Sequence, residues 1–135
     1  MDDRYCRLAR EYNGSIRIGD LGRAFTLLMD MAAVRRDENC AADEMKLLMI
    51  AFNLKTNGFA GDLKIDADLV ERIVSCNERF GAGEHEVTQL FYDTVAEDST
   101  PKRIMSLNDS IYLFLLVANG KTDTAQEILE QFVES

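Results

Sequence analysis

The segment Ala41–Lys55, AADEMKLLMIAFNLK, determines how the rest of the chain must be arranged. From residue 45 to residue 54 almost every side chain is apolar, so a helix here has hardly a polar side. Such a helix must be covered by neighbours on several sides, and we expect it at the centre of the fold. Asp43 and Glu44 suit the positive end of the helix dipole. Asn57-Gly58 is expected to end the helix in a left-handed turn.

Outside this segment, apolar residues spaced three and four apart, with turn residues between them, predict six more helices. Asn13-Gly14 is expected to end the first of them, and Ser15–Gly19 to form a connector that can make one short extended bridge. Asp20 and Ser106 are expected as helix caps. The sequence therefore predicts an all-α fold of six to seven helices, packed as antiparallel hairpins in one domain over residues 1–135. The six expected ranges are Asp2–Tyr12, Leu21–Arg36, Asp66 or Asp68 to Phe80, Gly83–Glu97, Ser106–Ala118 and Thr122–Val133.

The composition is that of an ordinary globular protein, with 47% hydrophobic and 29% charged residues. No apolar run approaches the roughly 18–20 residues that a membrane span needs. Met1–Arg4 lacks the basic and then apolar order of a secretory signal, so we expect an intracellular, cytoplasmic protein with no membrane partner. Cys6, Cys40 and Cys76 are far apart and odd in number, which argues against a disulfide framework or a zinc site. We expect them to be buried or half-buried free thiols.

The formal net charge of −9 is unevenly distributed along the chain. Residues 1–40 contain seven Arg and seven Asp or Glu, whereas residues 41–135 contain eight Lys or Arg and seventeen Asp or Glu. Because nucleic-acid-binding proteins usually carry a basic face, nucleic acid is disfavoured as a partner. The N-terminal arginines can still make one region locally positive; they are Arg4, Arg7, Arg10, Arg17 and Arg23.

Acidic residues gather on the outer side of the last predicted helix. These are the candidate partner-binding residues, Glu127, Glu130 and Glu134. We expect them to aid association with another protein that presents a basic surface or a basic helix, because opposite charges speed the encounter of two proteins.

One spacing of residues recurs along the chain. Gly19 is followed by small or large apolar residues 5, 8, 9 and 12 positions later, Gly120 repeats this order, and Gly83 follows it more loosely. The two close copies are Gly19, Ala24, Leu27, Leu28, Met31 and Gly120, Ala125, Ile128, Leu129, Phe132.

This spacing resembles the second helix of pentatricopeptide and tetratricopeptide repeats, most closely at Gly19-Asp20-Leu21. The resemblance implies stacked helical hairpins that bind another macromolecule. The chain departs from it after Gly58, where a loop stands in place of a second helix. A literal pentatricopeptide repeat would also need small polar side chains near Met49 and Val74 to read RNA bases, and both residues are apolar.

The alternation of long and short connectors also resembles paired EF-hands, as in calmodulin and myosin light chains. Gly14-Ser15-Ile16 followed by Asp20-Leu21 is similar to the second half of an EF loop. Gly61-Asp62-Leu63 with Asp68-Leu69 is a poorer copy. Calcium needs oxygen ligands at alternating loop positions, and neither loop supplies them. Hairpin repeat, degenerate EF-hand and unrelated bundle stay open as alternatives. The positions where an EF loop would need calcium ligands hold Ala9, Glu11 and Asn13 in the first loop, and Gly58 and Ala60 in the second.

The chain offers little for catalysis or metal binding. His85 is the only histidine and is flanked by Glu84 and Glu86 at the start of a predicted helix. Thr88 and Gln89, three and four positions further on, are poor metal ligands. No Ser or Cys lies in a recognisable nucleophile motif, and the glycines form neither a dinucleotide-binding nor a Walker phosphate-binding loop. We expect no catalytic residue, no cofactor and no metal.

These features favour a non-catalytic protein-interaction module, such as an adaptor, a small subunit or a light-chain-like clamp on a partner helix. The first alternative is an acidic inhibitor or immunity-type protein that blocks a basic enzyme, because an acidic surface steers association with a basic one. The second alternative is a helical-repeat RNA-binding protein. The identity of the partner and the oligomeric state stay open.

Overall fold

The computed structural model describes residues 3–57, 64–96 and 105–134, except the side chains of residues 3, 133 and 134. Within these ranges every regular element is a helix, which confirms the predicted all-α class. The helices are α1 (Asp3–Ile18), α2 (Leu21–Asp37), α3 (Ala41–Thr56), α4 (Ala67–Phe80), α5 (Glu84–Val95), α6 (Leu107–Ala118) and α7 (Thr122–Glu134).

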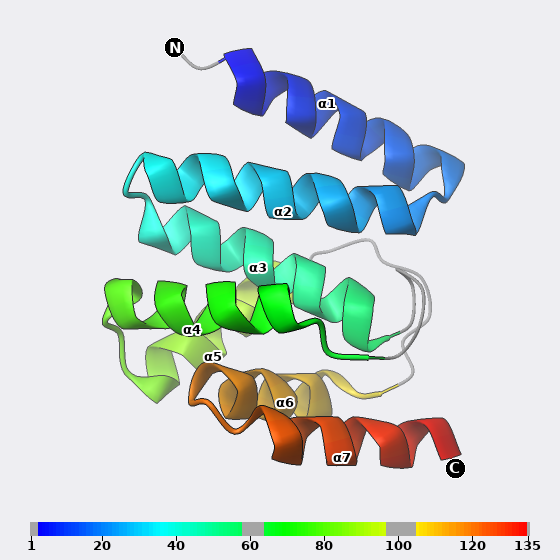
Figure 1. Cartoon of the computed structure of the whole chain (residues 1–135), viewed down its shortest axis with the longest axis vertical. Helices are drawn as coiled ribbons and strands as arrows, with labels where there is room; N and C mark the ends of the chain where they lie inside the picture. The colour runs from blue at the N-terminus through cyan, green and yellow to red at the C-terminus, as the bar shows by residue number, and fades with distance from the viewer. Residues whose placement is uncertain (1–2, 58–63, 97–104, 135) are drawn as a thin grey trace.

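Successive helices run back and forth, and the molecule is longest in the direction across them (Figure 1). Helices α1, α2 and α3 lie one after another from one end. Helix α3 packs against α2 on one side and against α4, α5 and α6 on the others, so the predicted central position of Ala41–Lys55 is confirmed. Helix α1 packs on α2 and helix α7 packs on α6, at opposite ends of the molecule.

Three phenylalanines from three helices meet at the centre of the core. Phe52 of α3, Phe91 of α5 and Phe114 of α6 are fully buried. The ring centroids of Phe52 and Phe114 are 5.3 Å apart, and the rings meet edge to face at 83°. Phe91 lies 5.2 Å from Phe114 and 6.5 Å from Phe52. Edge-to-face contacts add to the burial of these large apolar side chains and tie α3, α5 and α6 together.

Three of the tight turns between neighbouring helices have the same backbone geometry. Gly19, Asn39 and Gly120 each have a positive φ, of 77°, 58° and 80°. In each case the next residue donates a backbone hydrogen bond to the carbonyl five positions before it, at 2.8–2.9 Å. This arrangement satisfies a carbonyl at the helix end and turns the chain back sharply. It closes the α1–α2, α2–α3 and α6–α7 hairpins.

The predicted end of the first helix at Asn13-Gly14 is wrong, as is the connector and extended bridge predicted for Ser15–Gly19. Helix α1 continues to Ile18. Ser15 is buried and its Oγ donates to the Glu11 carbonyl at 3.0 Å. Packing of the following turn against α2 therefore outweighs the weak helix propensity of Asn-Gly.

Several predicted helix starts are confirmed. Asp20 accepts a hydrogen bond from the Arg23 N–H, at 3.1 Å. Ser106 accepts one from the Asp109 N–H, at 3.2 Å. Of the two candidates for the start of α4, Asp66 is the cap. The predictions for Gly58 and for the second EF-like loop at 61–63 lie outside the described residues.

The three cysteines differ in burial. Cys76 is buried and Cys40 is half-buried, whereas Cys6 is exposed on α1. The expectation of burial is therefore wrong for Cys6. It fails because α1 lies at one end of the molecule, where α2 is the helix on which it mainly packs.

Candidate functional site

Helix α6 presents apolar side chains on its outer face as well as its inner one. Leu113, Phe114 and Val117 are fully buried on the inner side. On the outer side the Tyr112 side chain is 55% exposed, and Leu115 and Leu116 are only half-buried. Tyr112 and Ile18, which is 77% exposed, are the exposed large hydrophobic residues of the described ranges. The outer face of α6 thus keeps apolar groups in contact with water.

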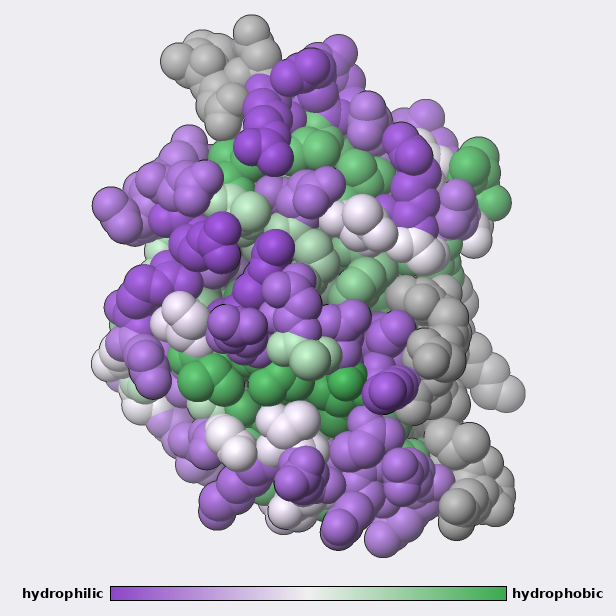
Figure 2. Space-filling view, in the orientation of Figure 1, coloured by the Kyte–Doolittle hydropathy of each residue, from purple (hydrophilic) through white to green (hydrophobic). Residues whose placement is uncertain are grey.

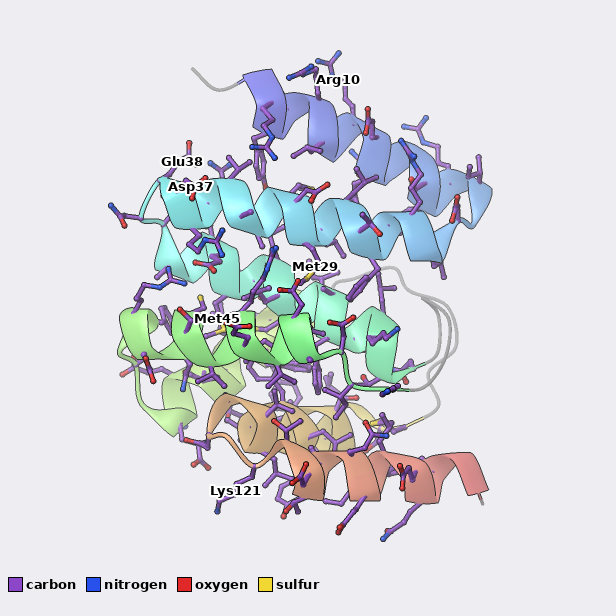
Figure 3. All side chains as sticks on the ribbon, viewed as in Figure 1. Arg10, Met29, Asp37, Glu38, Met45 and Lys121 are labelled. Carbon is purple, nitrogen blue, oxygen red and sulfur yellow. The ribbon has the colours of Figure 1, made fainter. Side chains whose placement is uncertain are left out.

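These side chains line a surface hollow of about 470 Å³. Helix α6 contributes most of the wall, while Glu84 comes from the start of α5 and Lys121 from the turn before α7. Figure 3 shows Lys121 at the same end of the molecule as α7. The wall consists of Glu84, Tyr112, Leu115, Leu116, Asn119 and Lys121.

A smaller pocket of about 70 Å³ lies next to the hollow and shares Glu84, Leu115 and Asn119 with it. Its far wall includes Asn77 of α4, whose amide Nδ2 lies 3.5 Å from the Ala118 carbonyl that accepts its hydrogen bond. Asn119 is fixed as well, since its Nδ2 donates to the Leu115 carbonyl at 2.7 Å. Two amides with fixed orientations therefore border an apolar surface, an arrangement suited to orienting a bound peptide or side chain.

Apolar surface is also visible elsewhere on the molecule. Figure 2 shows a mainly hydrophilic face crossed by an apolar band between α4 and α7. On α4, Val70 and Val74 precede Asn77 by seven and three residues and so share its face of the helix. Both are half-buried. The apolar surface is thus not confined to α6, which favours a contact larger than a small ligand.

A second pocket, of about 190 Å³, is lined by charged groups from α2, α3 and α4. The Glu44 side chain is only 1% exposed, and its two oxygens accept hydrogen bonds from Arg79 at 2.7 and 3.1 Å. Arg72 donates to the Met29 carbonyl at 2.7 Å and lies 3.4 Å from Asp68. Most of these charged groups already have partners. Their contacts join α4 to α3 through Glu44 and to α2 through the Met29 carbonyl.

Sequence reasoning missed this cluster. It assigned Glu44 only to the first turn of its helix, where an acidic residue suits the dipole. Glu44 and Arg79 are 35 residues apart, and no local pattern marks them as a pair.

Burial makes the thiol of Cys76 a poor nucleophile. Loss of hydration, reinforced by the nearby Glu44 carboxylate, raises its pKa to about 12. Its Sγ donates to the Ala41 carbonyl at 3.4 Å. Because only a thiolate reacts readily, this cysteine has a structural role at neutral pH.

Two of the acidic residues predicted for partner binding, Glu127 and Glu130, are not part of the wall of the hollow. Glu127 and Glu130 are exposed on α7, and Glu130 accepts a hydrogen bond from Gln126 Nε2 at 3.4 Å. The Glu134 side chain lies outside the described part of the chain. Asp123, four residues before Glu127, is exposed on the same face of the helix.

His85 lies with Glu84 and Glu86 in the first turn of α5, and all three are exposed. In the described part of the chain, no three His, Cys, Asp or Glu side chains are placed to hold a metal ion. Of the helices within 3–57, 64–96 and 105–134, none has the length and apolar character needed to cross a membrane.

Comparisons with protein-family models, with curated proteins and with solved structures give no significant match to this chain.

Proposed function

We propose that this chain is a non-catalytic protein-interaction module that binds its partner through the outer face of α6. The observation that carries the proposal is the exposed Tyr112 beside the half-buried Leu115 and Leu116, around a hollow of about 470 Å³. Exposed aromatic residues at the rim of an apolar pocket are typical anchors of protein–protein interfaces.

The chemistry of the wall also supports a protein partner. Glu84 and Lys121 have opposite charges, so the hollow attracts neither an anion nor a cation strongly. The leucines supply apolar area, while Asn119 and the Tyr112 hydroxyl supply polar groups. A hydrophobic side chain held within a polar peptide matches this mixture better than a nucleic acid does, because nucleic-acid sites depend on basic groups that contact phosphates.

Site-specific photo-crosslinking tests the proposal. Tyr112 is replaced by benzoyl-phenylalanine, a larger aromatic residue that this exposed position can hold, and the protein is irradiated in a lysate of its native host. We expect one predominant crosslinked protein, identified by mass spectrometry. The matched control carries the same group at Thr26, which is exposed on α2, a helix that packs on α1 and α3.

Affinity measurements with the captured protein then complete the test. Leu116→Asp places a charge in the apolar wall and should weaken binding at least tenfold, or about 1.4 kcal/mol. Lys46→Ala on the exposed side of α3 should leave the affinity unchanged. Equal crosslinking from positions 26 and 112, or an affinity that Leu116→Asp does not alter, would rule out this face.

A further inference from the structure

Helix α1 carries a row of arginines on the side that faces away from the protein. Its inner side packs Tyr5, Leu8, Ala9, Tyr12 and Ile16 against the core. On the opposite side, Arg7, Arg10, Gly14 and Arg17 follow each other at spacings of three and four. They form one line of about 15 Å, given a rise of 1.5 Å per residue. The three arginines are exposed, and Figure 3 shows Arg10 pointing outward from the end of the molecule.

Among the side chains described in α1, no carboxylate forms an ion pair with this row. Glu11 is the one carboxylate among the side chains described in α1, and it lies 3.4 Å from Arg23 of α2. Gly14 interrupts the arginines in the middle of the row. A Cβ added there would meet no other atom within 4 Å, so the surface at this point is open.

Helix α7, at the opposite end of the molecule, carries a matching acidic row. Asp123, Glu127 and Glu130 are exposed and share one face, since they are four and three residues apart. The other face of α7 is buried through Ala125 and Leu129. The chain therefore has a basic row on one end helix and an acidic row on the other, within a molecule of net charge −9.

We propose that the arginine row of α1 docks on the acidic row of α7 in a second copy of this chain. Figure 1 shows that α1 and α7 cross the molecule in the same general direction. Copies stacked end to end along the long axis would thus bring the two rows together as parallel helices.

The spacing of the charges fits this pairing. Arg10 and Arg17 are seven residues apart, as are Asp123 and Glu130, so both pairs are separated by about 10.5 Å along their helices. When Arg10 faces Asp123 and Arg17 faces Glu130, Glu127 lies opposite Gly14, where no side chain blocks it. The exposed Ile18 at the end of the row adds apolar area beside these ion pairs.

The same contact can repeat from copy to copy. Because it joins two different surfaces, it is heterologous, and stacking by translation produces an open chain of molecules instead of a closed dimer. The net charge of each copy opposes stacking. At physiological salt the Debye length is about 8 Å, so adjacent rows attract while more distant charges are largely screened.

A charge-swap cycle followed by sedimentation velocity tests the contact. One variant carries Arg10→Glu with Arg17→Glu, and the other carries Asp123→Arg with Glu130→Arg. The wild type should form oligomers whose mean mass rises with concentration. Each variant alone should associate at least tenfold more weakly, because its two end helices then carry the same sign of charge.

Mixing the two variants is the decisive step. Each end of one variant is complementary to an end of the other, so an equimolar mixture should recover association close to that of the wild type. Circular dichroism establishes that both variants keep their helices, and Lys46→Glu serves as a charge control on α3. A wild type that stays monomeric to millimolar concentration, or a mixture that does not associate, would overturn the proposal. Binding of a labelled single-stranded RNA to the wild type but not to the arginine variant would also overturn it, because the row would then contact phosphates.

Discussion

Glu44, the one carboxylate that is buried within the described part of the fold, forms an ion pair with Arg79. The Glu44 side chain is 1% exposed, while that of Arg79 is 35% exposed. The bidentate hydrogen bond to Glu44 raises the pKa of the Arg79 guanidinium, against the opposing effect of its burial. The ion pair with Arg79 thus compensates much of the charge of the buried carboxylate, and the arginine retains access to water.

Removal of Arg79 should therefore destabilise the protein more than its exposure suggests. Arg79→Met leaves Glu44 buried without its ionic partner, and breaking a buried pair in this way typically costs about 3–5 kcal/mol. We expect the loss of unfolding free energy to be about 3 kcal/mol or less, because water can reach the site that Arg79 leaves. The free energy of unfolding in urea measures this change.

The double variant Glu44→Met with Arg79→Met provides the comparison. Replacing both partners by apolar side chains removes the unpaired charge, so most of the lost stability should return. Arg10→Met on the exposed row of α1 is the control and should change stability by no more than about 0.5 kcal/mol. If Arg79→Met lowers the free energy of unfolding no more than Arg10→Met does, the buried Glu44 does not rely on its ion pair with Arg79.

The cysteines should differ sharply in their reaction with a thiol reagent at pH 8. Cys6 is exposed and should react fast, and the half-buried Cys40 should react more slowly. Cys76 should react only when the protein unfolds, because its pKa of about 12 leaves almost no thiolate. Single-cysteine variants followed by absorbance check this order; fast labelling of Cys76 in the folded protein would contradict its burial.

The pKa of Cys76 also has a consequence for stability at high pH. It is raised in the folded state from 9.0 to about 12, so the unfolded chain loses this proton first as the pH rises. The protonated Cys76 thiol therefore makes its full contribution to the free energy of unfolding below pH 9. This contribution is lost as the pH rises from 9 to about 12. In Cys76→Ala this part of the alkaline decline should disappear.

At the level of elements, α3 is the helix on which the fold depends most. Phe52 and Leu48 are fully buried, and Phe52 contacts both other core phenylalanines. Phe52→Ala or Leu48→Ala should cost about 2–5 kcal/mol, because each leaves a cavity that its neighbours fill only partly. Lys46→Ala, at an exposed position of the same helix, should cost little. Similar small losses of unfolding free energy at all three positions would show that α3 is not central.

Most of these elements could be predicted from sequence because their signals are local. The caps at Asp20 and Ser106 act on N–H groups three residues away. The recurrent glycine spacing also has a structural counterpart. Gly19 and Gly120 are both left-handed, and the alanines five residues after them, Ala24 and Ala125, are fully buried.

Local signals failed where tertiary packing decided the outcome. Asn13-Gly14 usually ends a helix, yet α1 continues for four residues beyond Gly14 to Ile18. The added turn brings Ser15 and Ile16 onto α2. At the start of α1, the Arg35 guanidinium of α2 lies 3.7 Å from the centroid of the Tyr5 ring. No pattern within residues 3–18 reveals these contacts.

For the whole molecule, the candidate site was much less predictable than the fold. The hollow brings together Glu84, Tyr112 and Lys121, which belong to three different segments. In the sequence Tyr112 is one apolar residue of IYLFLLVA, and its exposure is set by where α5 and α7 pack on α6. The acidic residues were identifiable because they share one helix, whereas the arginine row became visible only once α1 extended to Arg17.

The acidic face of α7 should also affect how fast the partner captured at Tyr112 associates. Charges outside the hollow steer the encounter of two proteins and have little influence once the complex has formed. If that partner has a basic surface, reversing Glu127, Glu130 and Glu134 to Lys should lower the association rate constant at low salt and leave the dissociation rate constant nearly unchanged. Stopped-flow measurements with the partner separate the two constants.

Salt provides the internal control for this prediction. The Debye length falls from about 10 Å at 0.1 M to about 3 Å at 1 M, so the difference between wild type and triple variant should shrink as salt is added. The variant must stay helical, which circular dichroism establishes. Glu127 and Glu130 lie on the exposed face of α7, opposite the buried Ala125 and Leu129, so the fold should tolerate their reversal. Identical association rates at low salt would mean that these residues do not steer this partner and serve only to keep α7 hydrated or to bind a second copy of the chain.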